Sequence, residues 1–293
     1  MNLELHPIGD SFAREVRGLD LWQALDGDAG AALRDAFAAH PLLVFRRQAL
    51  SEDELIGFGN ALGTPRQYVE RGWWSSRPEV SVVSNMRNGL GQPIGGLSSK
   101  ELNWHTDQSY NAVPVTGCFL YAQVIPEAGS RTSWADLYGA YDALPAHVKK
   151  SLDGAVGRFS YAARTRSVIP GVDGATVVQS YDERIRDTPD VRHALVHVHP
   201  VSGRKSMYID PGTLIAIDGM PDDEAQALFA MLLDVATRPG NVYRHDWRVG
   251  DLVLWDNAAT LHRRDAFADE QSRLLKRMII SLPAQSHILP AAL

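Results

Sequence analysis

A histidine and a carboxylate at close spacing are the first feature of this sequence that could do chemistry. His105 and Asp107 are separated only by Thr106. If this segment is extended, both side chains lie on the same face, because side chains along a strand alternate between its two faces. An imidazole and a carboxylate side by side can be two ligands of a metal ion. A chain with 10 His and 35 acidic residues can also contain this pattern by chance.

His262 could supply a third ligand, since it follows the apolar run 251–255 after a short polar segment. Two histidines and one carboxylate can occupy one face of an octahedral ion and leave the other positions open, as in non-haem Fe(II) oxygenases. Such open positions would admit exogenous ligands. The alternative is that His262, which precedes Arg263, Arg264 and Asp265, belongs to a solvated charged loop.

Two arginines near the C-terminal end could bind an anionic co-substrate. A guanidinium is planar and permanently charged, and it can donate two parallel hydrogen bonds to one carboxylate. In an extended segment Arg273 and Arg277 fall on one face, together with Leu275. The opposite face carries Leu274 and Met278 and could equally be the buried one. Periodicity therefore leaves both orientations open.

Short apolar segments separated by turn residues must position these side chains. The expected strands are residues 42–45, 80–83, 115–124, 194–199, 206–209, 241–247, 251–255 and 274–282. Helices are expected at 30–39, at 51–62 behind a capping-box pattern, and at 222–237. Many short strands without alternating helices favour a sandwich or barrel over a doubly wound sheet. We predict a mainly β fold with flanking α-helices, namely a double-stranded β-helix or jelly roll.

Length and composition are those of an ordinary globular protein, with 293 residues, 45% of them hydrophobic and 22% charged. No repeat, low-complexity tract or Gly/Ser linker marks a boundary, so one domain over 1–293 is expected. The net charge of −6 and the lack of a long basic run argue against a nucleic-acid partner. A small molecule is the expected partner.

The single cysteine and the N-terminal residues indicate the cellular compartment in which the protein is expected. Cys118 lies in the apolar run 118–121 and is expected to be a core thiol, and a lone cysteine excludes an internal disulfide and suits a reducing compartment. The first residues lack the pattern of a signal peptide, and no apolar stretch approaches the roughly 20 residues that span a bilayer. We expect no membrane contact and a cytoplasmic location.

Several of these segments together resemble one known family, that of taurine dioxygenase and chlorophenoxyacetate dioxygenase. Its members are Fe(II)- and 2-oxoglutarate-dependent enzymes with a jelly-roll fold. The resemblance runs from about Phe45 to Leu282. Its most specific parts are Trp104–Asp107, Gly129–Thr132, His199–Lys205, Trp255–Asn257, His262 and Arg273.

The resemblance implies a role for each matching residue. His105, Asp107 and His262 would ligate iron, while Thr132 and Arg273 would bind the C5 carboxylate of 2-oxoglutarate. The keto acid would contact the iron through its C1 carboxylate and C2 ketone. Arg277 matches a position that meets either the anionic group of the substrate or the C1 region of the keto acid. The substrate pocket would be lined by Tyr110, Gln108 and Asn103.

Two departures and one variable segment stand out against the family pattern. Gly129–Thr132 has Ser-Arg where the family usually has Gly-Asp, and Ala258 stands where it usually has arginine. Neither change removes an implied ligand. An active-site lid is expected within 66–102, where Trp73 and Trp74 could form an apolar wall.

The implied reaction consumes O2 and 2-oxoglutarate, releases succinate and CO2, and hydroxylates or otherwise oxidises a small organic substrate. Arg277 favours an anionic one. Two alternatives stay open: a zinc-dependent hydrolase or isomerase that uses the same triad, and a non-catalytic relative that only binds a small molecule. A homo-oligomer is expected by analogy alone.

Overall fold

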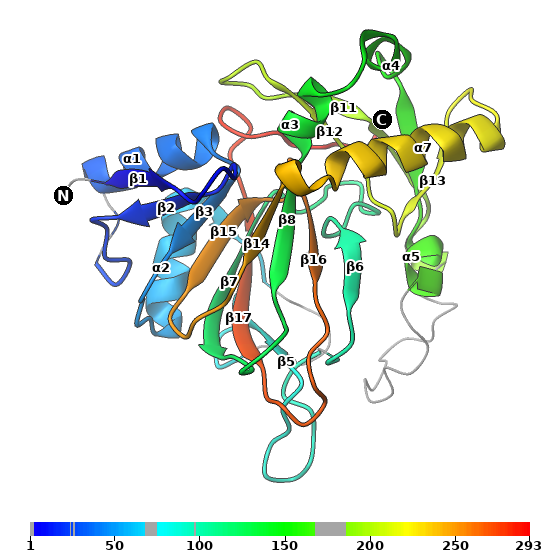
Figure 1. Cartoon of the computed structure of the whole chain (residues 1–293). Helices are drawn as coiled ribbons and strands as arrows, with labels where there is room; N and C mark the ends of the chain where they lie inside the picture. The colour runs from blue at the N-terminus through cyan, green and yellow to red at the C-terminus, as the bar shows by residue number, and fades with distance from the viewer. Residues whose placement is uncertain (1–2, 24, 26, 68–74, 97, 168–185) are drawn as a thin grey trace.

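Two β-sheets face each other at the centre of the computed structural model, which describes residues 3–23, 25, 27–67, 75–96, 98–167 and 186–293 (Figure 1). The larger sheet has the order β1 (Glu4–Pro7), β2 (Arg14–Arg17), β3 (Leu42–Phe45), β15 (Leu252–Asp256), β7 (Gly117–Val124), β17 (Leu274–Ser281) and β4 (Thr64–Pro65), and β5 (Ser81–Ser84) also pairs with β17. The smaller sheet has the order β14 (Val242–His245), β8 (Thr132–Asp136), β16 (Thr260–Arg264) and β6 (Leu102–His105). This is the predicted jelly roll.

Helices and two minor sheets flank this sandwich (Figure 1). The minor sheets consist of β10 (Val191–Ala194), β9 (Val156–Phe159) and β13 (Leu214–Ile217), and of β11 (Val196–Val198) with β12 (Lys205–Met207). The helices are α1 (Gly27–Ala39), α2 (Glu52–Leu62), α3 (Leu137–Asp142), α4 (Ala146–Ser151), α5 (Tyr161–Ser167), α7 (Asp222–Ala236) and the 3-10 turn η1 (Pro239–Asn241). In the described part of the chain, none of them is long and apolar enough to cross a membrane.

The central strands of the larger sheet are buried on both faces. One face packs against α1 and α2 and contributes Phe45, Phe119, Leu254 and Met278 to a core that includes Phe37 and Phe58. The other face points into the sandwich and contributes Val44, Leu120, Trp255 and Ile279 to a core with Trp134 and Tyr243. Double burial explains why these strands read as continuous apolar runs rather than as alternating patterns.

Several predicted elements are confirmed. Strand β3 has the predicted bounds, and α2 begins at the predicted capping box. There the Glu54 backbone N–H donates to Ser51 Oγ at 3.3 Å, and the Ser51 backbone N–H donates to Glu54 Oε2 at 2.7 Å. These bonds satisfy backbone donors that the first helical turn otherwise leaves unpaired.

The prediction of one strand over 194–199 is wrong. Strand β10 ends at Ala194 and pairs with β9, whereas β11 begins at Val196 and pairs with β12. Between them, the Leu195 backbone N–H donates to the Ala155 carbonyl at 2.9 Å, and the Leu195 carbonyl accepts from Tyr208 at 2.8 Å. The chain therefore changes sheets at Leu195.

The segment 66–102, in which we predict a lid, contains regular structure where it is described. Ser81–Ser84 form β5 and pair with Arg277–Leu274 of β17. Residues 88–92 close a turn in which the Asn88 backbone N–H donates to the Gln92 carbonyl at 2.8 Å. Trp73 and Trp74 lie outside the described residues, so the lid stays a prediction.

Candidate active site

The pairing of β6 with β16 brings the two candidate histidines together. His105 and His262 are direct partners across this antiparallel pair, and their ring centroids lie 4.0 Å apart. The possibility that His262 belongs to a solvated loop is wrong, because it lies within β16, between β8 and β6, and is 7% exposed. Its ring also packs against Trp255, with centroids 5.1 Å apart.

Asp107 reaches the histidines from a turn and not from the strand. Strand β6 ends at His105, and the side-chain amide of Asn257 holds the backbone of Asp107 just beyond it. The Asp107 N–H donates to Asn257 Oδ1 at 3.0 Å, and Asn257 Nδ2 donates to the Asp107 carbonyl at 3.0 Å. Asn257 therefore gives the turn the same two hydrogen bonds that a neighbouring strand would give.

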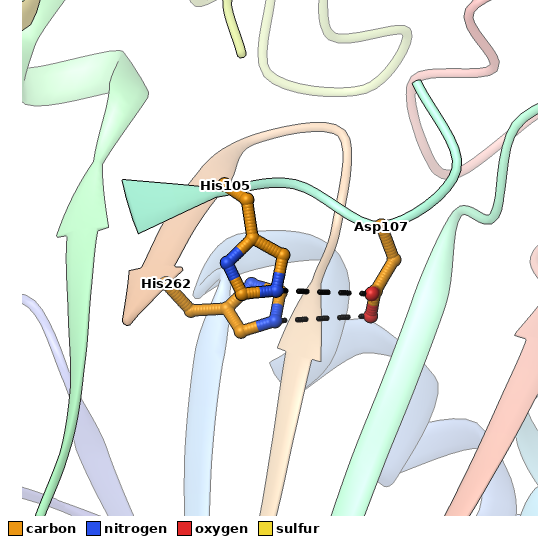
Figure 2. Close-up of side chains that lie close together, drawn as sticks. All are labelled: His105, Asp107 and His262. Carbon is orange, nitrogen blue, oxygen red and sulfur yellow. Dashed lines mark ion pairs between the residues drawn. The ribbon is translucent and has the colours of Figure 1, made fainter. Parts of the chain in front are cut away.

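The three side chains converge on one point, as Figure 2 shows. The Asp107 carboxylate lies 4.0 Å from His105 Nε2 and 3.8 Å from His262 Nε2. His105 Nδ1 lies 2.7 Å from the carbonyl of Asn103. A carbonyl can only accept, so Nδ1 carries the proton and Nε2 keeps a lone pair directed toward Asp107.

Burial sets the charge of the triad. Burial lowers the pKa of His105 to about 3, with a further contribution from His262, and lowers that of His262 to about 4. Both imidazoles are therefore neutral at pH 7, which is the form that binds metals. Burial alone would raise the pKa of Asp107, but the positive charge of Arg277, with smaller contributions from His262 and His105, outweighs the effect of burial and lowers that pKa. Arg277 Nη2 lies 2.8 Å from Asp107 Oδ2.

A cavity of about 70 Å³ joins the triad to the predicted keto-acid residues Thr132 and Arg273, and Arg277 also lines it. Thr132 Oγ1 accepts a hydrogen bond from Trp247 Nε1 at 2.9 Å. Arg273 is 1% exposed, yet its Nε has no partner and, among the described residues, no carboxylate pairs with it. Burial, followed by the charge of Arg264, lowers its pKa to about 9, so it remains charged at neutral pH. A buried unpaired cation is costly, so this cavity is suited to an anion.

The other predicted substrate residues lie in and before the turn that follows β6. Asn103 is exposed, and its carbonyl orients His105. Gln108 has a left-handed backbone with φ of 57°. Tyr110 packs edge-on against Tyr161 of α5, with ring centroids 4.9 Å apart. Their contact with a substrate stays a prediction.

Sequence reasoning missed three contributions to this site. Asn257 stands out in the sequence only as part of the Trp255–Asn257 motif, although it holds Asp107. Trp247, which donates to Thr132, has no sequence signal that links it to the site. Arg264 follows His262 by two residues, and this spacing on a strand could have indicated that both face the same cavity. Cys118 is a buried core thiol as predicted, and its Sγ lies 3.7 Å from Asp107 Oδ2.

The two departures from the family pattern lie away from the triad. Arg131 is exposed and pairs with Asp246. Ala258 is buried in a small apolar cluster with Tyr138 and Ile288. Neither side chain lines the cavity.

We expect Asn257→Ala to weaken both the fold and the metal site. The substitution leaves the Asp107 N–H and carbonyl and the Val115 carbonyl without their partner, which costs about 2–4 kcal/mol of unfolding free energy. Thermal unfolding and Mn(II) titration measure the two effects. Ser286→Ala removes only a hydroxyl bonded near the C-terminus and serves as the control. Unchanged Mn(II) affinity in a folded Asn257→Ala protein would contradict the role of Asn257 at the site.

The donor set fits a divalent first-row transition metal. Two neutral imidazole nitrogens and one carboxylate lie within 4.8 Å of one another and are all buried. They can bind one face of an ion and leave the opposite face open toward the cavity. A jelly roll with this facial set beside a buried anion pocket defines the class of non-haem metal oxygenases.

Comparisons with known proteins agree with this class. The family model described as "Taurine catabolism dioxygenase TauD, TfdA family" matches residues 4–279, so the chain belongs to this family. It is 32% identical to the alpha-ketoglutarate-dependent 2,4-dichlorophenoxyacetate dioxygenase of Cupriavidus pinatubonensis, over 94% of this chain and 97% of that protein. It is 29% identical to the alpha-ketoglutarate-dependent sulfate ester dioxygenase of Pseudomonas putida, over 96% and 90%.

Solved structures show the same fold. The crystal structure of AAD-2 in complex with Mn(II) and N-oxalylglycine matches with a TM-score of 0.79 and 27% identity, covering 97% of this chain and 98% of that one. A taurine dioxygenase from Burkholderia xenovorans matches with a TM-score of 0.77 and 26% identity, over 99% and 94%. The chain is thus an Fe(II)- and 2-oxoglutarate-dependent dioxygenase.

Proposed function

We propose that His105, Asp107 and His262 hold one Fe(II), and that Thr132 and Arg273 bind the C5 carboxylate of 2-oxoglutarate. The observation that carries this assignment is the buried, uncompensated guanidinium of Arg273 in the same cavity as the triad. A zinc hydrolase with the same three ligands would leave that charge without a partner. A dicarboxylic keto acid supplies one.

When bound, the iron and the keto acid supply the activation of O2, with release of succinate and CO2. The chain's own side chains prepare the site for this. His105 and His262 offer neutral nitrogens because burial disfavours their protonated forms. Asp107 is held ionised and would offset part of the charge of a bound ion. The near-complete burial of all three excludes bulk water from the reacting groups.

We propose that the oxidised substrate is a small organic anion. Arg277 lies at the triad, with its side chain 24% exposed. A second cation, Arg164 of α5, is near enough for its charge to contribute to the lowered pKa of His105. These positive charges favour a carboxylate, sulfonate or sulfate group next to the metal. The substrates named in two relatives, dichlorophenoxyacetate and sulfate esters, are of this kind.

We expect a screen of small carboxylates, sulfonates and sulfate esters to find compounds that stimulate succinate formation with Fe(II) and 2-oxoglutarate. For such a compound, Arg277→Leu should raise KM by about tenfold to a hundredfold, because one charge-assisted contact is lost. Lys276→Leu, on the opposite face of the same strand and paired with Glu52, is the matched control. Unchanged KM for the anion and unchanged affinity for the keto acid in Arg277→Leu would reject an anion-binding role for this residue.

Domain organisation, cellular location and oligomeric state are also part of the proposal. We propose that the chain works as one jelly-roll domain, since the family match extends from residue 4 to 279. The composition supports a cytoplasmic enzyme without a nucleic-acid partner, and analogy supports a homo-oligomer. Size-exclusion chromatography with light scattering measures the oligomeric state.

A further inference from the structure

Arg264 faces the same interior as the triad and the keto-acid residues. In the pairing of β16 with β8, His262 lies opposite Trp134, and Arg264 lies opposite Thr132. Side chains two residues apart on a strand share a face, so Arg264 lies beside Thr132 on the inner side of the smaller sheet. Arg264 and Arg273 line the same cavity.

Arg264 is held in place but is not neutralised. Its side chain is 4% exposed, its Nη2 donates to the Lys100 carbonyl, and its guanidinium lies over the Phe267 ring at 5.2 Å. Its Nε and Nη1 are buried and have no hydrogen-bond partner. In the part of the chain that the structure describes, no carboxylate forms an ion pair with Arg264. The neighbouring Arg263, by contrast, pairs with Glu101 and Asp265.

One guanidinium is enough to recognise a carboxylate, yet two buried guanidiniums, those of Arg264 and Arg273, line this cavity. Their repulsion is evident in Arg273, whose pKa is lowered by burial and then by the charge of Arg264. Burying a second unpaired charge opposes folding unless an anion compensates it. The arrangement is therefore expected to serve a ligand that both guanidiniums contact.

We propose that Arg264 is a positioning residue for the distal carboxylate of 2-oxoglutarate, which Arg264 and Arg273 clamp together. The proposal rests on the proposed function of the triad. Two residues along a strand separate the Cα atoms of His262 and Arg264 by about 7 Å, and both side chains face the same cavity. A five-carbon diacid, with four carbon–carbon bonds of about 1.5 Å each, has a similar reach. The clamp would thus favour a keto acid with a second carboxylate at this distance from the metal.

The test compares two keto acids of equal chain length, 2-oxoglutarate and 2-oxopentanoate, in calorimetric titrations of anaerobic Fe(II)-loaded protein. 2-Oxopentanoate has a methyl group in place of the distal carboxylate. We expect Arg264→Met to weaken 2-oxoglutarate binding by about tenfold to a hundredfold, and Arg264→Lys by less. The affinity for 2-oxopentanoate should change by less than about twofold, because it has no carboxylate for the clamp to bind.

Arg244→Met is the matched control, since it makes the same change at an exposed position of β14, which lies on the other side of β8 from β16, and should leave both affinities unchanged. If Arg264→Met binds 2-oxoglutarate as tightly as the unaltered protein does, the proposed clamp is wrong. An equal loss of affinity for both keto acids would also overturn it, because such a loss indicates a general distortion of the site or a separate inorganic anion. If Arg264→Met does not fold, the ratio of the two affinities in Arg264→Lys decides in the same way. If the unaltered protein binds no 2-oxoglutarate at all, the proposed function itself fails.

Discussion

Asp107→Ala is expected to abolish substrate-stimulated succinate formation, with a fall of at least about a thousandfold. The substitution removes the carboxylate that faces His105 and His262 at 4.0 and 3.8 Å. It also leaves Arg277 without its contact at 2.8 Å, so a positive charge would replace a negative one beside the ion. Mn(II) titration and succinate analysis measure binding and turnover separately.

A carboxylate at the edge of the site provides the control for this experiment. Glu101 is exposed, precedes β6 and pairs with Arg263, so Glu101→Ala should keep both metal binding and turnover. Full succinate formation by Asp107→Ala would refute the metal assignment. A loss of turnover with full Mn(II) affinity would instead assign Asp107 to a role other than metal binding.

Arg273→Met is expected to stabilise the ligand-free protein and to remove its response to 2-oxoglutarate. The guanidinium is 1% exposed and has no counter-ion among the described residues, so an apolar side chain of similar length should raise the unfolding free energy by about 1–3 kcal/mol. The midpoint of thermal unfolding should rise by about 2–8 °C. The keto acid should no longer raise it further, because the site for its distal carboxylate is gone.

These opposite changes separate loss of function from misfolding. Thermal unfolding with and without 2-oxoglutarate measures both the midpoint of the ligand-free protein and its increase on binding the keto acid. Arg131→Met removes an exposed arginine just before Thr132 and should change neither quantity appreciably. A lower unfolding midpoint in Arg273→Met, together with an unchanged response to the keto acid, would show that Arg273 is structural.

Much of this site could be predicted from the sequence, but the contacts between distant segments could not. His105 and Asp107 do lie together, although only His105 is on a strand. Asp107 depends on Asn257, which is far along the chain, and no local pattern reports a contact between such distant residues. Strand β16 was missed because its last two residues are arginines, which read as a solvated loop. In fact Arg263 packs over the Trp104 ring, and Arg264 is buried opposite Thr132 of β8.

The ambiguous orientation of β17 has a physical cause. Met278 packs against the helices, and Leu275 packs inside the sandwich, so both faces are apolar and buried. A period-two pattern identifies a core face only when the other face is polar. The sequence alone therefore could not decide which face of β17 carries the cavity. The pairing of β17 with β7 and β5 places Arg273 and Arg277 in its lining.

The pairing of His105 with His262 across β6 and β16 bears on whether the site forms before a metal ion binds. Backbone hydrogen bonds of the sheet bring the two imidazoles together, and the side-chain amide of Asn257 holds the backbone of Asp107. The proposed ligands are thus positioned by hydrogen bonds of the chain itself, in contrast to zinc fingers, which are unfolded without their metal. Such a scaffold can release its ion and be reloaded without losing its shape. Metal supply would then regulate how much of the enzyme is active and not how much of it is folded.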